Sequence, residues 1–137
     1  MKSKKSKIFK QYKNTEVAHF SEKSPIQVIG TILNELERSM TIVADKIENE
    51  KTTISNNNIK SKSNHFTRAM LAIYSLQTSL DFEEGGDLSI KLFQLYEYCR
   101  TQLIKGFARK VVDGIRSAVN ALKEILLAWE EMEQNAK

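Results

Sequence analysis

Apolar residues recur every three or four positions along four separate stretches of this chain. That spacing places them on one face of an α-helix, and no competing strand pattern with a period of two is present. Five glycines and one proline in 137 residues leave few turns, which argues against a sandwich of short strands. Each helix can bury its apolar face only against the others, so the sequence predicts an all-α fold, an antiparallel four-helix bundle.

The first predicted helix has a well-marked start. Ser24 and Gln27 have the spacing of a capping box, and Pro25 stands at the first helical position, where its missing N–H costs no hydrogen bond. We therefore expect a helix over about 25–50. Its inward face would consist of Ile29, Ile32, Leu33, Leu36, Met40, Val43, Ala44 and Ile47.

A polar segment separates the first helix from the second. Residues 52–64 are rich in Asn and Ser, whose side chains bond to nearby backbone and so compete with helix formation. We expect a loop over this range, with Asn64 capping a second helix that ends near Asp81. The inward face of that helix would consist of Phe66, Ala69, Met70, Ile73, Leu76, Gln77 and Leu80.

Glycines mark the boundaries of the third helix. Gly85 and Gly86 permit a turn with positive φ, and Asp87 is a suitable N-cap after them. We expect Gly106 to end or bend this helix, and the fourth helix to start near Lys110. The third helix would bury Leu88, Leu92, Leu95, Tyr96, Cys99 and Leu103, and the fourth Ile115, Ala118, Val119, Leu122, Ile125, Leu126, Trp129 and Met132.

The net charge of +4 is a property of the N-terminus. Residues 1–13 hold six lysines and no acid, which leaves 15 basic against 17 acidic side chains in the rest of the chain. A nucleic-acid-binding domain needs basic residues on its folded face, so we do not expect nucleic acid as a partner. We interpret residues 1–23 as a basic, partly disordered and extended arm, and residues 24–134 as the bundle domain.

The sequence contains no pattern typical of a catalytic or metal site. His19 and His65 lie far apart and neither has a ligand at metal-binding spacing. Cys99 lies on an apolar face, where a thiol behaves as a small hydrophobe. The run from Glu83 to Gly86 lacks the spacing and the Lys-Ser/Thr end of a phosphate loop. We therefore expect a non-enzymatic protein with no cofactor and no metal.

The distribution of apolar residues also indicates where the protein is located in the cell. No segment is long enough to cross a bilayer, and no apolar stretch follows the cationic start. A single cysteine suits a reducing compartment. The sequence predicts a cytoplasmic protein without membrane insertion.

Several apolar residues fall beside the inward faces of the predicted helices. They either widen the core or form a groove that receives another apolar helix. These residues are Tyr74, Ile90, Phe93, Tyr98, Ile104, Phe107 and Leu127.

Residues 79–98 combine a helix-ending segment, a glycine pair and a new helix with Leu and Tyr at helical spacing: Ser79-Leu80-Asp81, Glu83, Gly85-Gly86, Asp87-Leu88, Leu92, Leu95-Tyr96 and Tyr98. This combination resembles the central signature of the FliS flagellin export chaperones. The resemblance extends over roughly residues 8–132. Further matches are Tyr12-Lys13, Val17, Ser24-Pro25, Arg68-Ala69, residues 73–76 and Ala128-Trp129-Glu130.

The resemblance implies a cytoplasmic chaperone that binds the disordered C-terminal segment of flagellin in helical form. Such a chaperone prevents premature polymerisation and helps deliver flagellin to the flagellar type III export gate; the gate and a flagellar regulator would be further partners. The candidate client-binding residues are Ile8, Tyr12 and Val17 in the arm, and Ile90, Phe93, Ile104 and Leu127 in the bundle.

The sequence leaves three questions open. The arm either caps the groove or contacts the client, and the chain is either a monomer or a homodimer. Residues 33–35, Leu-Asn-Glu, depart from the family pattern, which has an aromatic and a small residue there. This departure favours an alternative, a helical adaptor or regulatory scaffold whose client is not flagellin.

Overall fold

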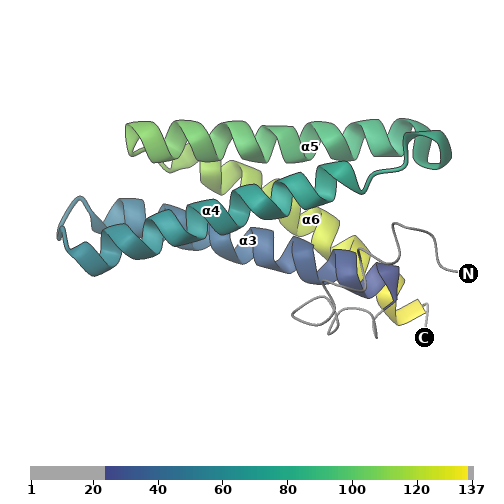
Figure 1. Cartoon of the computed structure of the whole chain (residues 1–137), viewed down its shortest axis with the longest axis horizontal. Coiled ribbons are helices and arrows are strands. Elements are labelled where there is room, and N and C mark those ends of the chain that lie inside the picture. Colours follow the sequence, from purple (N-terminus) through teal and green to yellow (C-terminus); the bar gives the residue numbers. More distant parts are fainter. Residues whose placement is uncertain (1–23, 136–137) are drawn as a thin grey trace, which may run out of the picture.

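The structure, a computed structural model, describes residues 24–135, which form four α-helices. The helices are α3 (Pro25–Asn49), α4 (Asn56–Thr78), α5 (Phe82–Arg109) and α6 (Asp113–Asn135). Consecutive helices run antiparallel and the described residues contain no strand (Figure 1). The predicted all-α four-helix bundle is therefore confirmed.

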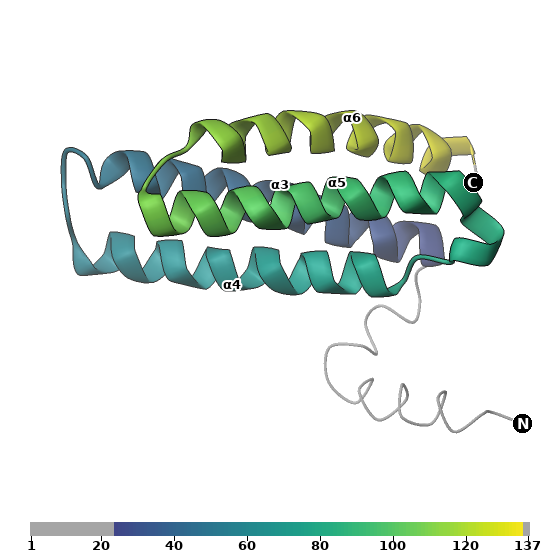
Figure 2. The same ribbon diagram turned by 90° about the horizontal axis from the view of Figure 1, so that it is seen from above.

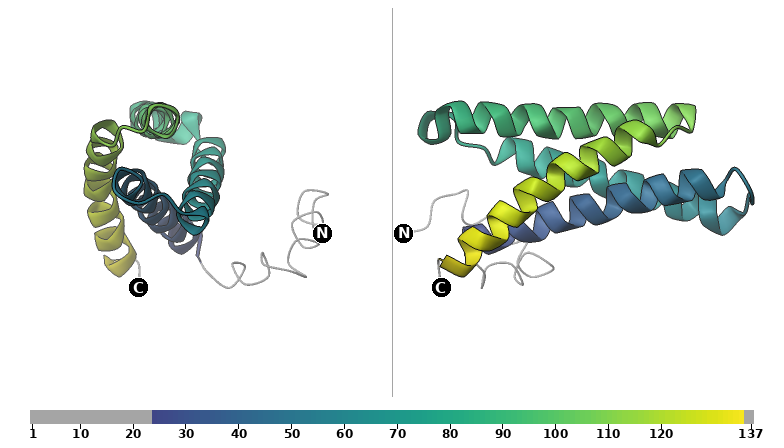
Figure 3. Two further views of the ribbon diagram at one scale, coloured as in Figure 1. Left: turned by 90° about the vertical axis from the view of Figure 1, so that its left-hand side faces the viewer. Right: turned by 180° about the vertical axis from the view of Figure 1, so that it is seen from behind.

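The helices form a ring in chain order. α3 packs against α4 and α6, and α5 packs against the same two helices. Figure 2 shows α4 and α6 on opposite sides of α5. α6 crosses the bundle obliquely, starting beside the end of α5 and finishing beside the start of α3 (Figure 3). There the indole Nε1 of Trp129 donates a hydrogen bond to the carbonyl oxygen of Ile26 at 2.7 Å.

The predicted start of α3 is confirmed in detail. The Ser24 hydroxyl accepts a hydrogen bond from the Gln27 N–H at 3.2 Å, and the Gln27 side chain accepts one from the Ser24 N–H at 3.1 Å. This is a complete capping box, with Pro25 at the first helical position. Two otherwise unpaired backbone donors are thereby satisfied.

The predicted loop over residues 52–64 is wrong, because α4 begins at Asn56. The Ser55 hydroxyl caps it by accepting a hydrogen bond from the Asn58 N–H at 3.1 Å. The Asn58 side chain donates to the Lys46 carbonyl oxygen of α3 at 3.0 Å. Ser55 thus serves as the helix cap and Asn58 bonds one helix to the other. These tertiary contacts override the low helix propensity of the polar residues.

A buried ion pair holds the same end of the bundle. Lys62 of α4 pairs with Glu50, which is the C-cap of α3. The Lys62 side chain is 8% exposed and the Glu50 side chain is 7% exposed. Lys62 Nζ lies 2.5 Å from Glu50 Oε1. That oxygen has no donor in hydrogen-bond geometry, so the contact is mainly electrostatic. Lys62 Nζ also lies 5.0 Å from the centre of the Phe107 ring.

The start of α5 differs from the prediction as well. Asp81, not Asp87, is the N-cap, and its carboxylate accepts hydrogen bonds from the N–H groups of Glu83 and Glu84 at 3.1 and 3.0 Å. The expected positive φ is present at Gly86 (φ 50°, ψ −126°), where it kinks the helix. The glycines therefore lie within α5 and not before it.

The end of α5 and the start of α6 also lie further along the chain than predicted. α5 continues past Gly106 to Arg109 and ends at Lys110, which has left-handed backbone (φ 59°, ψ 44°). A Cβ at position 106 would lie 2.5 Å from the Val111 carbonyl oxygen. Gly106 thus permits the close return of the chain into α6 and does not end the helix.

The core contains most of the residues predicted to be inward-facing. The predicted burial is wrong for two residues, since Leu88 is 63% exposed and Met132 is 39% exposed. Leu88 belongs to the second turn of α5 and Met132 to the last turn of α6, and Figure 3 shows these two helix ends apart from each other. The buried apolar residues are Leu33, Leu36, Met40, Val43, Ala44, Ile47, Ala69, Ala72, Ile73, Leu76, Tyr96, Cys99, Leu103, Ile115, Ala118, Val119, Leu122 and Leu126.

Replacing Lys62 by alanine should destabilise the fold. Glu50 would remain buried without its closest cation, and losing one partner of a buried pair costs about 3–5 kcal/mol. Lys110→Ala is the matched control, because its Nζ lies 4.0 Å from the same carboxylate but its side chain is 66% exposed. Urea unfolding measures both variants. Equal losses of stability would contradict a special role for the buried pair.

Replacing Gly86 by alanine should also lower the free energy of unfolding, by about 1–3 kcal/mol, because a Cβ disfavours positive φ. The space around Gly86 is open, so the cost would come from the backbone alone. Gly114→Ala, in the first turn of α6, is the control, since the added Cβ meets only the Gln102 side chain. Thermal unfolding of both variants tests this, and a neutral Gly86→Ala would show that the backbone strain is absent.

Candidate functional site

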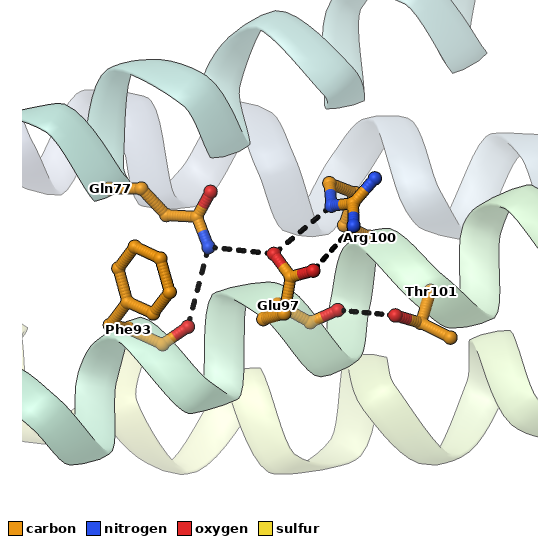
Figure 4. A network of polar contacts seen from close by, with 5 residues as sticks. All are labelled: Gln77, Phe93, Glu97, Arg100 and Thr101. Carbon is orange, nitrogen blue, oxygen red and sulfur yellow. Dashed lines mark hydrogen bonds and ion pairs between the residues drawn. The ribbon is translucent and has the colours of Figure 1, made fainter.

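One side of α5 carries exposed apolar side chains next to α4. Ile90, Phe93, Glu97 and Ile104 are spaced by three, four and seven residues, which places them on one side of the helix. The Gln77 side chain of α4 donates hydrogen bonds to the Phe93 carbonyl oxygen at 3.4 Å and to Glu97 Oε1 at 3.1 Å (Figure 4). These two bonds show that this side of α5 borders α4.

Aromatic residues extend the same surface. Phe82, in the first turn of α5, has its ring centre 6.0 Å from that of Phe93. Tyr74 lies one helical turn before Gln77 and so on the same side of α4. We call this surface the α4/α5 face; its residues are Tyr74, Phe82, Ile90, Phe93 and Ile104, with exposed fractions of 67%, 48%, 46%, 38% and 41%.

The length of the α4/α5 face is set by α5. Ile90 and Ile104 are separated by four helical turns, or about 20 Å along the helix axis. Exposed apolar residues spaced three, four and seven apart over such a length match the contacts that an amphipathic helix makes in a groove. The face therefore offers apolar contact area in a helical pattern.

A polar network crosses this face between its apolar residues. Arg100 Nε donates to Glu97 Oε1 at 3.0 Å, and its second nitrogen pairs with Glu97 Oε2 (Figure 4). Hydrogen bonds from Arg100 and Gln77 lower the pKa of Glu97 to about 2. Glu97 is thus a carboxylate at neutral pH, and its bond to Gln77 connects α5 to α4.

The structure brings together three of the seven predicted client-binding residues. Ile90, Phe93 and Ile104 lie on the α4/α5 face. Leu127 is 68% exposed but belongs to α6, which lies across α5 from α4. Ile8, Tyr12 and Val17 lie outside the described residues.

Phe107 is another of the apolar residues predicted to lie beside an inward helix face. Phe107 packs against Phe66 with ring centres 4.3 Å apart and belongs to the partly buried layer around the core.

Sequence reasoning missed Phe82, because we expected a turn there and no helix. The signal was present in Asp81 followed three residues later by Glu84, the spacing of a helix start.

The single cysteine and the metal-ligating side chains of the bundle were candidates for reactive groups. Burial raises the pKa of the Cys99 thiol to about 12, so it stays protonated near neutral pH. Within residues 24–135, no three His, Cys, Asp or Glu side chains converge as a metal site would require. No helix in this part of the chain combines the length and apolar character needed to cross a membrane.

Comparison with known proteins identifies the family. The family model described as "Flagellar protein FliS" matches residues 6–136. The chain belongs to the FliS family. A relative from Vibrio cholerae serotype O1 (strain ATCC 39315 / El Tor Inaba N16961), named "Flagellar secretion chaperone FliS", is 24% identical over 122 residues, covering 88% of this chain and 85% of the relative.

The FliS signature in residues 79–98 has a structural explanation. Asp81 caps α5, Gly86 adopts the positive φ of the kink, and the buried Ser89 hydroxyl donates to the Asp81 carbonyl oxygen at 2.8 Å. A Cβ at Gly85 would lie 1.9 Å from the Ser89 oxygen. The signature therefore shapes the turn that presents Phe82 beside Phe93.

The Glu97 carboxylate should contribute a pH-dependent stabilisation. Its folded pKa of about 2 is below its ordinary value of 4.5, so the contribution is full above about pH 4.5 and is lost as pH falls towards 2. Because the side chain is 39% exposed, solvent screening should limit the effect to less than about 1 kcal/mol. Urea unfolding of Glu97→Gln against the unsubstituted chain should show a difference at pH 7 that shrinks at pH 3.

Glu124→Gln is the matched control for this measurement. Glu124 is an exposed acid of α6 with no ion pair within the described part of the chain. Its substitution should leave the pH profile of stability unchanged. If Glu97→Gln and Glu124→Gln behave alike, the network contributes nothing to stability.

Proposed function

We propose that this chain is a cytoplasmic flagellar export chaperone that binds the disordered C-terminal segment of flagellin as helix. It keeps flagellin from polymerising prematurely and helps deliver it to the flagellar type III export gate. Membership of the FliS family and the name of the Vibrio cholerae relative support export chaperoning. The observation that carries flagellin binding is the exposed α4/α5 face.

The physical requirement for such binding is apolar contact area. A disordered segment loses chain entropy when it becomes helical on a surface, and burial of apolar side chains must offset that loss. The α4/α5 face supplies two neighbouring aromatic rings, Phe82 and Phe93, and two aliphatic residues on the same side of α5, Ile90 and Ile104. Side chains spaced three and four apart on the client would alternate with these residues.

Phe93 is the expected anchor of the interface. Its ring centre lies 6.0 Å from that of Phe82, and its carbonyl oxygen accepts a hydrogen bond from Gln77, so both its ring and its backbone are held in place. Pre-ordered aromatic residues near the middle of an interface contribute most of its binding energy. Ile90 and Ile104 would add contacts along the same client helix.

The remaining predicted residues would extend the contact beyond this face. Leu127 lies on the far side of α5, so a client that reaches it must continue around the bundle. Ile8, Tyr12 and Val17 belong to this proposal as contacts of the N-terminal arm. An adaptor role with another client would use the same face and differs only in the partner bound.

Replacing Phe93 by alanine should weaken binding of a flagellin C-terminal peptide by about 2 kcal/mol, roughly 30-fold, because an anchor is truncated. Isothermal titration calorimetry measures the affinity, and circular dichroism confirms that the bundle remains helical. Ile54→Ala is the matched control, since Ile54 is 71% exposed in the connection between α3 and α4. Its affinity should equal that of the unsubstituted chain.

Two results would contradict the proposal in different ways. Failure of the unsubstituted chain to bind the peptide at micromolar concentration would exclude flagellin as the client. Equal affinities for Phe93→Ala and Ile54→Ala would retain flagellin as the client but place its binding site away from the α4/α5 face.

A further inference from the structure

A second apolar surface lies where α4 borders α3. An open cleft of about 360 Å³ lies there. Leu71, at its edge, is 62% exposed, one of the most exposed large apolar side chains in the described part of the chain. The cleft is lined by Thr31, Ile32, Glu35, Arg68, Leu71, Ala72 and Ser75.

The cleft is elongated in a way that suits a helix. Its α4 rim runs from Arg68 to Ser75, about 10 Å or two helical turns. Its α3 rim runs antiparallel to this, from Glu35 back to Thr31. Apolar side chains from both helices lie along the middle, so the floor is a groove of the kind that receives the apolar side of an amphipathic helix.

The charges at one end of the cleft indicate the chemistry of the occupant. Arg38 Nη1 and Arg68 Nη1 lie 3.7 and 3.8 Å from the same carboxylate, that of Glu35. Both arginines remain more than half exposed, at 56% and 57%. Two guanidinium groups share one carboxylate, so this end of the cleft has an excess positive charge.

A neighbouring histidine responds to the same positive field. Burial lowers the pKa of His65, and the charges of Arg68 and Arg38 lower it further. His65 is therefore neutral near pH 7, and it does not add to the positive charge. The two arginines supply positive charge at this end of the cleft, on long side chains that can turn towards an incoming carboxylate.

We propose that the α3/α4 cleft docks an amphipathic helix of a second protein, with aliphatic residues against Ile32, Leu71 and Ala72 and an acidic residue against Arg68 and Arg38. The cleft lies where α4 borders α3, and the α4/α5 face lies where α4 borders α5; the two surfaces adjoin on α4 at Leu71 and Tyr74, which are three residues apart. A client held by the α5 residues of the α4/α5 face leaves the cleft open, so the chaperone can hold its client and a second partner together.

The test uses the full 137-residue chain and two synthetic helical peptides. Each peptide has about four turns and leucines spaced three and four apart; one has glutamates on its flanks and the other has lysines in their place. The acidic peptide should bind about tenfold more tightly than the basic one. Its glutamates would pair with Arg68 and Arg38, whereas the lysines of the basic peptide would be repelled by them. Amide chemical-shift changes should centre on residues 31–35 and 68–75.

Three variants make the test specific. Arg68→Glu should reverse the preference between the two peptides, and Leu71→Asp should abolish binding of both. Ile54→Asp, in the distant connection, is the control and should change neither affinity. Equal affinities of the two peptides for the unsubstituted chain, or shift changes centred on the α4/α5 face, would overturn the proposal.

Competition with the flagellin peptide separates this inference from the proposed function. Saturating flagellin peptide should leave the affinity for the acidic peptide unchanged. Displacement of the acidic peptide would assign the cleft to the client and overturn a separate partner. If the flagellin peptide fails to bind while the acidic peptide binds the cleft, the proposed function fails and this inference stands.

Discussion

Burial of one face of α3 is the packing contact on which the bundle depends. α3 contacts α4 and α6 along its length and also reaches α5 across the core. Six apolar side chains of this helix, between Leu33 and Ile47, are fully buried. Fully burying a side chain of this kind contributes about 1.5–3 kcal/mol, so this one helix face accounts for a large share of the apolar stabilisation. The capping box and the contact of Trp129 with Ile26 fix where α3 begins relative to α6.

The oblique course of α6 follows from that contact and determines which surfaces stay open. Because α6 ends beside the start of α3, it leaves the first turns of α5 uncovered on one side (Figure 3). Leu88 is therefore exposed although its spacing suits the core. On the other side of α5, polar bonds from Gln77 tie the helix to α4 near Phe93, and the Phe66 and Phe107 rings pack together nearer its end. The apolar residues beside the polar bonds remain exposed.

The sequence was sufficient for the helices and for most of the core, because periodicity and caps are local signals. The Ser24 capping box and the inward face of α3 are examples. It was insufficient where contacts far apart in the chain decide the outcome. The start of α4 depends on Asn58 meeting Lys46 and on Lys62 meeting Glu50, and neither pairing can be read from residues 52–64. Phe93 was predicted as a contact residue from its position beside the stripe. Predicting its neighbour Phe82 as well would have required knowing that Asp81, and not Asp87, caps α5.

Both proposed binding surfaces share α4, and its packing argues that they act independently. Thermodynamic coupling between two sites requires an element that shifts between two arrangements. Ala69, Ala72, Ile73 and Leu76 of α4 are buried, and close-packed interiors resist small displacements. Lys62 and Asn58 hold its first turns to α3, and Gln77 holds its last turn to α5. A helix fixed along its length offers no second arrangement through which occupancy of one surface could reach the other, so client and second partner would couple only where they meet, at the neighbouring Leu71 and Tyr74.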